Sequence, residues 1–232
     1  MKQLPQVIKN KVKNFKIVIS LDVKSIGRLA CIVVVLGVVQ FFLLTFLAAL
    51  FYPGGFDYLG YYFSDLGAVV AKNGEPNPVS SALFSVTVIV VALTLIPFWL
   101  IIRSLFTESR LEKVLSILGS ALGLMSFPFL IGVALSPIDT QLETHILLTV
   151  IFFSLFVFAA LLYSITIMLN RDYSNYFGLV GLVLFVISLV ILADPLATYV
   201  PFLQTIVLYG YFAWVLLQTF LVWHRNNLRG HT

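Results

Sequence analysis

The chain has 232 residues and a formal net charge of +4; 60% of its residues are hydrophobic, only 10% are charged, and the mean hydropathy is +1.04. A soluble domain carries about a quarter charged residues, so this composition excludes an ordinary soluble protein and indicates an integral membrane protein. The single cysteine, Cys31, excludes a disulfide within one chain and a site built from several thiolates.

Basic residues dominate residues 1–28, before the first apolar run. Ile8, Val12, Phe15 and Ile19 recur at helical spacing, which is typical of an amphipathic helix lying on the inner leaflet. A positive tail that only sets the topology explains the same charges. We therefore assign these residues to a basic cytoplasmic segment, and both interpretations stay open.

Six apolar stretches follow, each long enough to cross a hydrocarbon layer of about 30 Å as a helix of about 20 residues. Lipid cannot satisfy an open backbone, so uninterrupted apolar runs of this length form helices. The sequence therefore predicts an all-α polytopic membrane bundle over residues 29–223, followed by a tail at 224–232. The expected spans are 29–52, 80–102, 115–135, 145–168, 176–197 and 200–223.

Lysine and arginine set the expected orientation. If the N-terminus is cytoplasmic, six spans place every one of the 14 Lys and Arg residues except Lys72 on the cytoplasmic side. We therefore expect a multi-pass protein of the cell membrane with both termini inside. The net positive charge then reflects topology rather than nucleic-acid binding, so the expected partner is membrane lipid and not a nucleic acid.

Acidic residues have the opposite distribution. In this topology six of the ten lie on the outer side, where His145 joins them, and such a face fits a cation, a metal or a basic ligand better than a phosphate. The six are Asp57, Asp65, Glu75, Asp139, Glu143 and Asp194.

The longest expected loop, residues 53–79, is also outside. Its aromatic residues are typical of a belt at the lipid headgroups: Phe56, Tyr58, Tyr61, Tyr62 and Phe63. Ser64 and Asp65 follow in the same apolar setting, where a hydroxyl and a carboxylate are costly unless they are bonded or solvated.

Residues 136–145, SPIDTQLETH, contain two competing helix starts. One capping box would begin at Ser136 and use Asp139; the other would begin at Thr140 and use Glu143. The second start leaves Asp139 in the loop and puts His145 in the second helical turn. We therefore expect Glu143 to be a cap and Asp139 and His145 to belong to a site.

Prolines mark the ends and bends of other spans. Asn77 before Pro78 is expected to cap the second span, and Asp194 before Pro195 to end the fifth. Pro97 and Pro128 predict kinks in the second and third spans.

Gly119 and Gly123 form a GxxxG motif in the third span, which favours close helix contact inside the bundle or between two protomers. A homo-oligomer through these glycines is one expected partner. Interhelical hydrogen bonds are the expected role of the glutamines within the spans: Gln40, Gln204 and Gln218.

Two short patterns carry a resemblance to a known family. The first is Phe-Ser-Asp-Leu-Gly at residues 63–67, followed by Asn77, Ser80 and Ser81; the second is Gly132, Pro137, Asp139 and His145. In these patterns the chain resembles the prokaryotic membrane proteins called domain of unknown function 998, over residues 29–223. It is more distantly similar to the DRAM/FRAG/SFK membrane proteins, which share a six-helix layout. The resemblance implies no activity, because the family has none assigned, but it adds weight to Ser64, Asp65, Asp139 and His145 as a group.

The candidate polar site consists of Ser64, Asp65, Asp139, His145 and Asp194 at the outer face. Scattered interfacial residues are the alternative to a convergent site. A catalytic zinc site usually has two or three histidines. His224 and His231 are expected on the other side of the membrane from His145, so such a site is excluded within one protomer. A carboxylate-rich site for another divalent ion is compatible with the sequence. No cofactor is indicated.

Three functions remain open. The first is a lipid- or small-ligand-binding or structural membrane protein. The second is a lipid-modifying hydrolase or transferase of the outer leaflet that uses Asp65, Asp139 and His145, although the chain has no Gly-x-Ser-x-Gly elbow. The third is a small transporter, which the edge position of the charges disfavours.

Overall fold

The computed structural model describes residues 6–194 and 197–228, and the side chains of residues 25–194 and 197–225. Over this part the chain is helical, as the sequence predicts, and has no strands. Seven α-helices and two short 3-10 helices follow one another: α1 (Gln6–Leu50), η1 (Phe63–Gly67), α2 (Pro78–Thr94), α3 (Ile96–Ile102), η2 (Arg103–Leu105), α4 (Arg110–Leu135), α5 (Leu142–Leu169), α6 (Asn175–Ala193) and α7 (Val200–Leu228).

Six of the described segments are long and apolar enough to cross a membrane, which confirms the predicted multi-pass bundle. They are Ser25–Leu50, Pro78–Leu105, Arg110–Leu135, Leu142–Leu169, Asn175–Ala193 and Val200–Arg225. The fifth ends at Ala193 and not at residue 197, because Asp194 is its C-cap and leaves the helical conformation before Pro195.

The second span consists of α2, α3 and η2, because the helix breaks at Leu95. Pro97 explains the position of the break: it has no N–H, and its ring would clash with the carbonyl of the residue four positions earlier. Pro128, by contrast, lies inside α4, and the helix continues through it.

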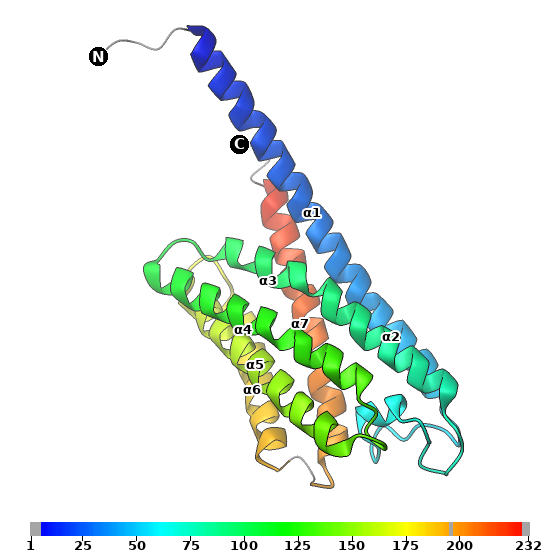
Figure 1. Ribbon diagram of the computed structural model, residues 1–232. Coiled ribbons are helices and arrows are strands. Elements are labelled where there is room, and N and C mark those ends of the chain that lie inside the picture. Colours follow the sequence, from blue (N-terminus) through cyan, green and yellow to red (C-terminus); the bar gives the residue numbers. More distant parts are fainter. Residues whose placement is uncertain (1–5, 195–196, 229–232) are drawn as a thin grey trace.

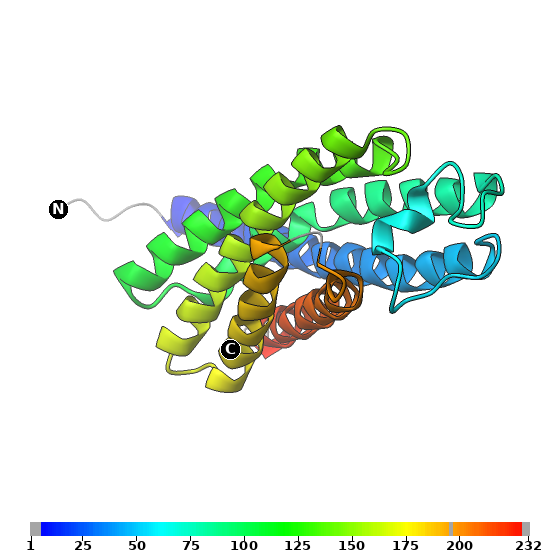
Figure 2. The same ribbon diagram turned by 90° about the horizontal axis from the view of Figure 1, so that it is seen from below.

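The helices form two groups on either side of α7 (Figures 1 and 2). On one side α4, α5 and α6 pack next to one another, and on the other α1 pairs with α2. The last helix, α7, contacts both α1 and α6 and so closes the bundle. Polar connecting segments lie at both ends.

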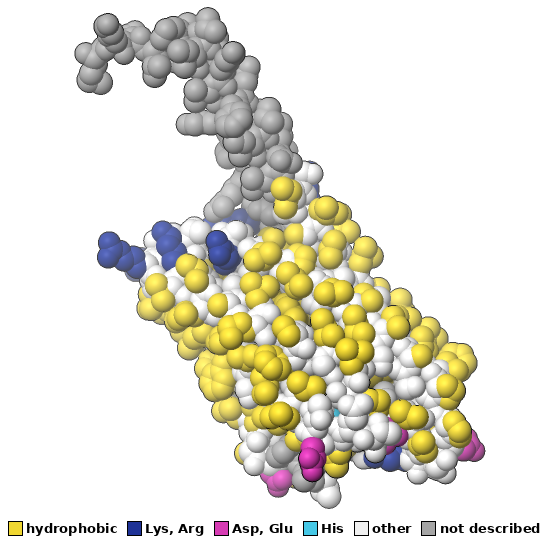
Figure 3. Space-filling view, viewed as in Figure 1, with side chains coloured by type: hydrophobic (Ala, Val, Ile, Leu, Met, Phe, Trp, Pro, Cys, Tyr) yellow, Lys and Arg dark blue, Asp and Glu magenta, His cyan; other side chains and the backbone are white. Residues whose placement is uncertain are grey.

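Charge distinguishes the two ends of the bundle (Figure 3). Asp and Glu gather at one end, which we call the acidic end and define by residues 51–77, 136–141, 194 and 197–199. Lys and Arg gather at the opposite, basic end, defined by residues 103–113, 170–174 and Arg225. Which end faces the cytoplasm stays a prediction.

The first and the last helix, α1 and α7, extend beyond the predicted spans. α1 continues without a break from Gln6 into the first span, so the backbone has no boundary at residue 28 (Figure 1). The side chains of residues 1–24 lie outside the described part, and so does the amphipathic face expected there. At the other end α7 continues to Leu228, beyond the predicted boundary at residue 223.

The GxxxG glycines pack inside the chain. A Cβ added at Gly119 would lie 2.9 Å from the Tyr163 ring on α5, and one added at Gly123 would overlap the Trp99 ring on α3. Between them the Ser120 hydroxyl donates to the Trp99 carbonyl at 2.5 Å. The motif thus brings α4 close to α3 and α5, and a homo-oligomer through it stays a prediction.

Candidate functional site

The loop at residues 51–77 folds back over the ends of the helices (Figure 2), and every residue of η1 within it is buried. The Phe63 ring stacks on Phe41, with ring centroids 5.7 Å apart, and also contacts Phe84. Gly67 lies so close to the Phe84 ring that a Cβ would overlap it, which explains the glycine at the end of the Phe-Ser-Asp-Leu-Gly motif. The short helix is therefore fixed against α1 and α2.

The aromatic residues of this loop pack on one another, and their expected belt at the lipid headgroups stays a prediction. Phe63 is buried, and the rings of Phe56, Tyr58 and Tyr61 are partly buried against one another and against Tyr52. Edge-to-face contacts of this kind are favourable between aromatic rings. The loop is thus a packed cap on the bundle.

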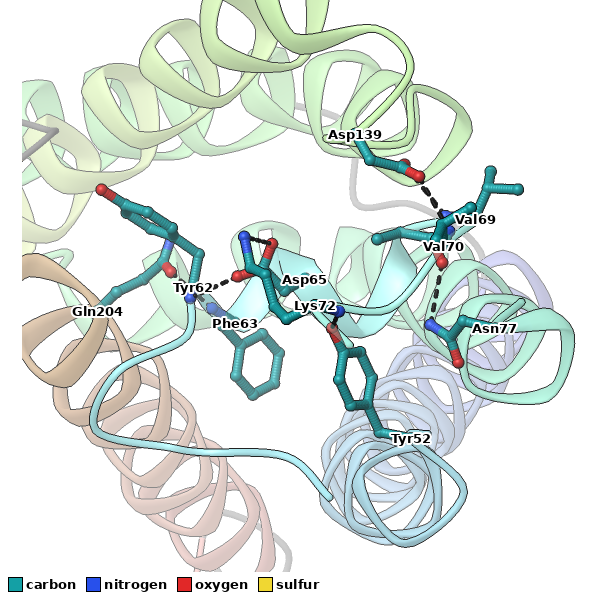
Figure 4. Close-up of polar contacts among 11 residues, drawn as sticks. Tyr52, Tyr62, Phe63, Asp65, Val69, Val70, Lys72, Asn77, Asp139 and Gln204 are labelled. Carbon is teal, nitrogen blue, oxygen red and sulfur yellow. Dashed lines mark hydrogen bonds and ion pairs between the residues drawn. The ribbon is translucent and has the colours of Figure 1, made fainter. Parts of the chain in front are cut away.

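Asp65 stabilises the conformation of this loop (Figure 4). One carboxylate oxygen accepts the backbone N–H of Tyr62 at 2.9 Å, and the other lies 3.0 Å from the Lys72 ammonium. The Asp65 side chain is 2% exposed and that of Lys72 49%. Burial raises the pKa of Asp65, and the Lys72 ammonium opposes that rise.

Asp139 joins two loops that are far apart in the sequence (Figure 4). It lies in the α4–α5 connection, and its two carboxylate oxygens accept the N–H groups of Val69 at 3.0 Å and Val70 at 2.9 Å. Asp139 is thus in a loop, as the Thr140 helix start required, and each of its carboxylate oxygens accepts a backbone N–H.

Neither predicted capping box of α5 forms. The helix begins at Leu142 with Gln141 as N-cap, and no side chain caps it. Asp139 is not available because it binds the Val69 and Val70 N–H groups, and Glu143 is an exposed residue of the first turn. There its charge can still interact favourably with the helix dipole.

Asn77 occupies the predicted N-cap position of α2, but its side chain has another role. Its amide nitrogen donates to the carbonyls of Leu66, at 3.3 Å, and Ala68, at 2.9 Å. The Ser80 hydroxyl also donates to the Leu66 carbonyl, at 2.9 Å. Asn77 and Ser80 thus satisfy the carbonyls at the end of η1, which is why they accompany the Phe-Ser-Asp-Leu-Gly motif.

His145 lies in the second turn of α5 and is 3% exposed. Its Nδ1 atom lies 2.6 Å from the carbonyl oxygen of Ser136. A carbonyl only accepts hydrogen bonds, so Nδ1 carries the hydrogen, and in the neutral ring Nε2 is an acceptor. Among the described residues Nε2 has no hydrogen-bond partner.

His145 lines a cavity of about 170 Å³ between η1, α5, the end of α6 and the start of α7. Its polar lining includes Ser64, His145, Thr149 and Gln204, and most of the remaining wall is apolar. A smaller cavity of about 60 Å³ shares these four residues and Phe153. Tyr62 also lines the larger cavity, and its apolar lining residues are Ile138, Leu142, Ile146, Val150, Phe153, Ile191, Leu192 and Val200.

Four of the residues that line the cavity retain unused hydrogen-bonding capacity. The Thr149 hydroxyl is buried without a partner, and over the described chain the Ser64 hydroxyl has none either. Gln204 accepts the Phe63 N–H through Oε1 at 2.9 Å, which leaves its amide nitrogen unused (Figure 4). Such groups are costly in an apolar setting unless a ligand or water satisfies them.

The structure thus brings Ser64 and His145 to one cavity and places the three predicted carboxylates outside its lining. Asp65 pairs with Lys72, Asp139 binds backbone, and Asp194 is exposed at the end of α6. In the described part of the chain no three His, Cys, Asp or Glu residues are placed to hold a metal ion.

Sequence reasoning did not place Gln204 and Thr149 in the site. Gln204 does bond a second element, as expected, because its Oε1 accepts the Phe63 N–H of η1. Only the position of η1 against α7 decides that the amide nitrogen of Gln204 stays unused. Thr149 follows His145 by four residues, so both lie on one face of α5. That spacing is the signal that could have identified Thr149.

The model of the family described as "Protein of unknown function (DUF998)" matches residues 35–223. The chain belongs to this family. The DUF998 match extends from the first span to the sixth and includes the cavity. No curated protein and no solved structure matches the chain significantly. The more distant similarity to the DRAM/FRAG/SFK proteins stays a prediction.

Proposed function

We propose that this protein binds a lipid at the acidic end of its bundle, with the lipid head in the cavity and the chain along α5. The observation that supports this is a cavity with apolar walls in which the polar groups of Ser64, His145, Thr149 and Gln204 have unmet hydrogen-bonding capacity. Leaving a buried polar group unpaired costs about 1–3 kcal/mol. A ligand with a polar head and an apolar chain would remove that cost.

A path for the chain supports the same proposal. Leu142 and Val150 line the cavity, yet they are 52% and 37% exposed on α5. The apolar wall therefore continues onto a helix face that membrane lipid would cover. A bound chain could leave the cavity along this face without entering water.

Native mass spectrometry of the full chain in mild detergent tests the proposal. We expect lipid to stay bound to the wild type. Ile146→Trp, which fills the cavity, should reduce the retained lipid about tenfold or more, since it removes both space and contact area. Leu147→Trp is the matched control, because Leu147 is the next residue of α5 and is 60% exposed.

Two outcomes would overturn the proposal. One is that the wild type retains no lipid under conditions that keep it folded. The other is that Ile146→Trp and Leu147→Trp retain as much lipid as the wild type.

A lipid-modifying enzyme is the second candidate function. It is favoured by the unbonded Ser64 hydroxyl and the His145 Nε2 atom in one cavity. Asp65 and Asp139 serve the loop, so Ser64 and His145 would be the reacting pair. Lipid profiles of cells with the wild type and with Ser64→Ala test this: an enzyme predicts a product that disappears in the variant, and identical profiles contradict it.

A further inference from the structure

We infer that the bound lipid is an uncharged alcohol whose hydroxyl head donates to His145 Nε2 and accepts from the amide nitrogen of Gln204. The inference rests on the proposed function and names the ligand class. Three observations support this ligand class: the direction of each hydrogen bond in the cavity, the charges around the cavity and the volume of the cavity.

The histidine and the glutamine supply opposite hydrogen-bonding roles. His145 Nδ1 donates to the Ser136 carbonyl, which leaves Nε2 as an acceptor in the neutral ring. Gln204 Oε1 accepts from Phe63 N–H, so the amide orientation is fixed and its nitrogen is a donor. A head that can both donate and accept satisfies the two, and a hydroxyl is the smallest such group.

Ser64 and Thr149 are compatible with the same hydroxyl head. The side chains of Ser64 and Thr149 line the cavity, and a hydroxyl can either donate or accept a hydrogen bond. They can therefore bond an alcohol oxygen or its proton, depending on how the head is turned.

Charge excludes a phosphate head. Among the described residues that line the cavity there is no Lys, Arg, Asp or Glu. The nearest cation in the loop, Lys72, is paired with Asp65, and Asp65 follows Ser64 directly. A phosphate beside Ser64 would meet that carboxylate without a cation of its own, and burying an unpaired charge is strongly unfavourable.

The size of the cavity limits what it encloses. A volume of about 170 Å³ is close to the roughly 150 Å³ cavity that holds one benzene ring in another protein. The head and its first few carbons therefore fill the cavity. The rest of the chain leaves past Leu142 and Val150, which are exposed.

The test compares three single-chain lipids that differ only at the head: oleyl alcohol, oleyl phosphate and oleyl acetate. Purified full-length protein is delipidated in an amine-oxide detergent, which carries no hydroxyl, and binding is measured by native mass spectrometry. We expect oleyl alcohol to bind about tenfold or more tightly than either ester, because the phosphate adds charge and the acetate removes the donor.

A matched pair of variants assigns the effect to the cavity. Thr149→Val keeps the side-chain shape and removes a hydroxyl that has no partner among the described residues. We expect oleyl alcohol to bind about three- to tenfold more weakly while the melting temperature of the lipid-free protein stays equal or rises. Thr144→Val, at an exposed position of the same helix, should change neither quantity.

Equal or tighter binding of oleyl phosphate or oleyl acetate would overturn the assignment of the head and leave lipid binding intact. So would unchanged affinity of Thr149→Val for oleyl alcohol. If none of the three lipids binds but cell lipids are retained, the ligand class is wrong and the proposed function stands. If nothing is retained at all, both fail.

Discussion

Asp65 is a buried carboxylate, which is energetically unfavourable, and it also has a structural role. Its carboxylate is almost fully buried at the acidic end, and it is tolerated because it bonds the Tyr62 N–H and the Lys72 ammonium. Burial raises the pKa of Asp65 above its ordinary value of 3.8; Lys72, the Tyr62 N–H and the nearby His145 act in the opposite direction. The folded protein therefore takes up this proton at a higher pH than the unfolded chain does.

This shift predicts a pH dependence. Between 3.8 and the raised pKa the folded state binds more protons than the unfolded state, so the contribution of Asp65 to the free energy of unfolding falls as the pH rises. The melting temperature of the wild type relative to Asp65→Asn should therefore decrease as the pH rises from about 4 through this window. An increase instead would mean that the Lys72 ion pair outweighs burial.

At the scale of elements, carboxylates fasten the loop at residues 51–77 to the bundle. Asp139 reaches it from the α4–α5 connection, while the isolated pairing of Val70 with Pro76 shapes the loop itself. η1 presents Ser64 to the cavity, so the position of the loop decides the geometry of the site. Asp139 is thus a positioning residue for the cavity.

Asp139→Ala should lower the free energy of unfolding by about 1–2 kcal/mol, because two backbone N–H groups lose a charged acceptor. Hydrogen exchange at the amides of Val69 and Val70 should become faster. Glu143→Ala removes a carboxylate from the same segment that makes no capping bond, and it should leave both measurements nearly unchanged. An equal loss in the two variants would contradict the role given to Asp139.

At the scale of the whole molecule, charge divides the bundle into an acidic and a basic end (Figure 3). The positive-inside rule predicts that the acidic end, with the cavity, faces outward. A lipid bound there would come from the outer leaflet.

Cysteine labelling of intact cells tests this orientation. In a background in which the buried Cys31 is replaced by Ala, Glu75→Cys at the acidic end should react with a membrane-impermeant maleimide. Glu108→Cys, exposed at the basic end, should react only after lysis. The reverse pattern would place the cavity on the cytoplasmic side.

Most of the fold could be predicted from the sequence, because a membrane-spanning helix is specified locally. About 20 apolar residues must form a helix in lipid wherever they pack, so the six spans follow from composition alone. The predicted start of α5 within SPIDTQLETH was wrong because that region has several possible caps. Which residue caps the helix depends on a loop 70 residues away, whose Val69 N–H binds Asp139. Polar side chains near helix ends have too many local partners for the sequence to select one.

The sequence by itself determined the all-helical membrane fold and the separation of charge between its ends, and it named Ser64 and His145 among five candidate site residues. Only the tertiary structure decided that Asp65 and Asp139 hold a loop while Ser64 and His145 line a cavity with Thr149 and Gln204. The physical reason is that hydropathy acts over one segment at a time. Whether a polar group is paired or free depends on which groups other segments bring within about 3 Å of it.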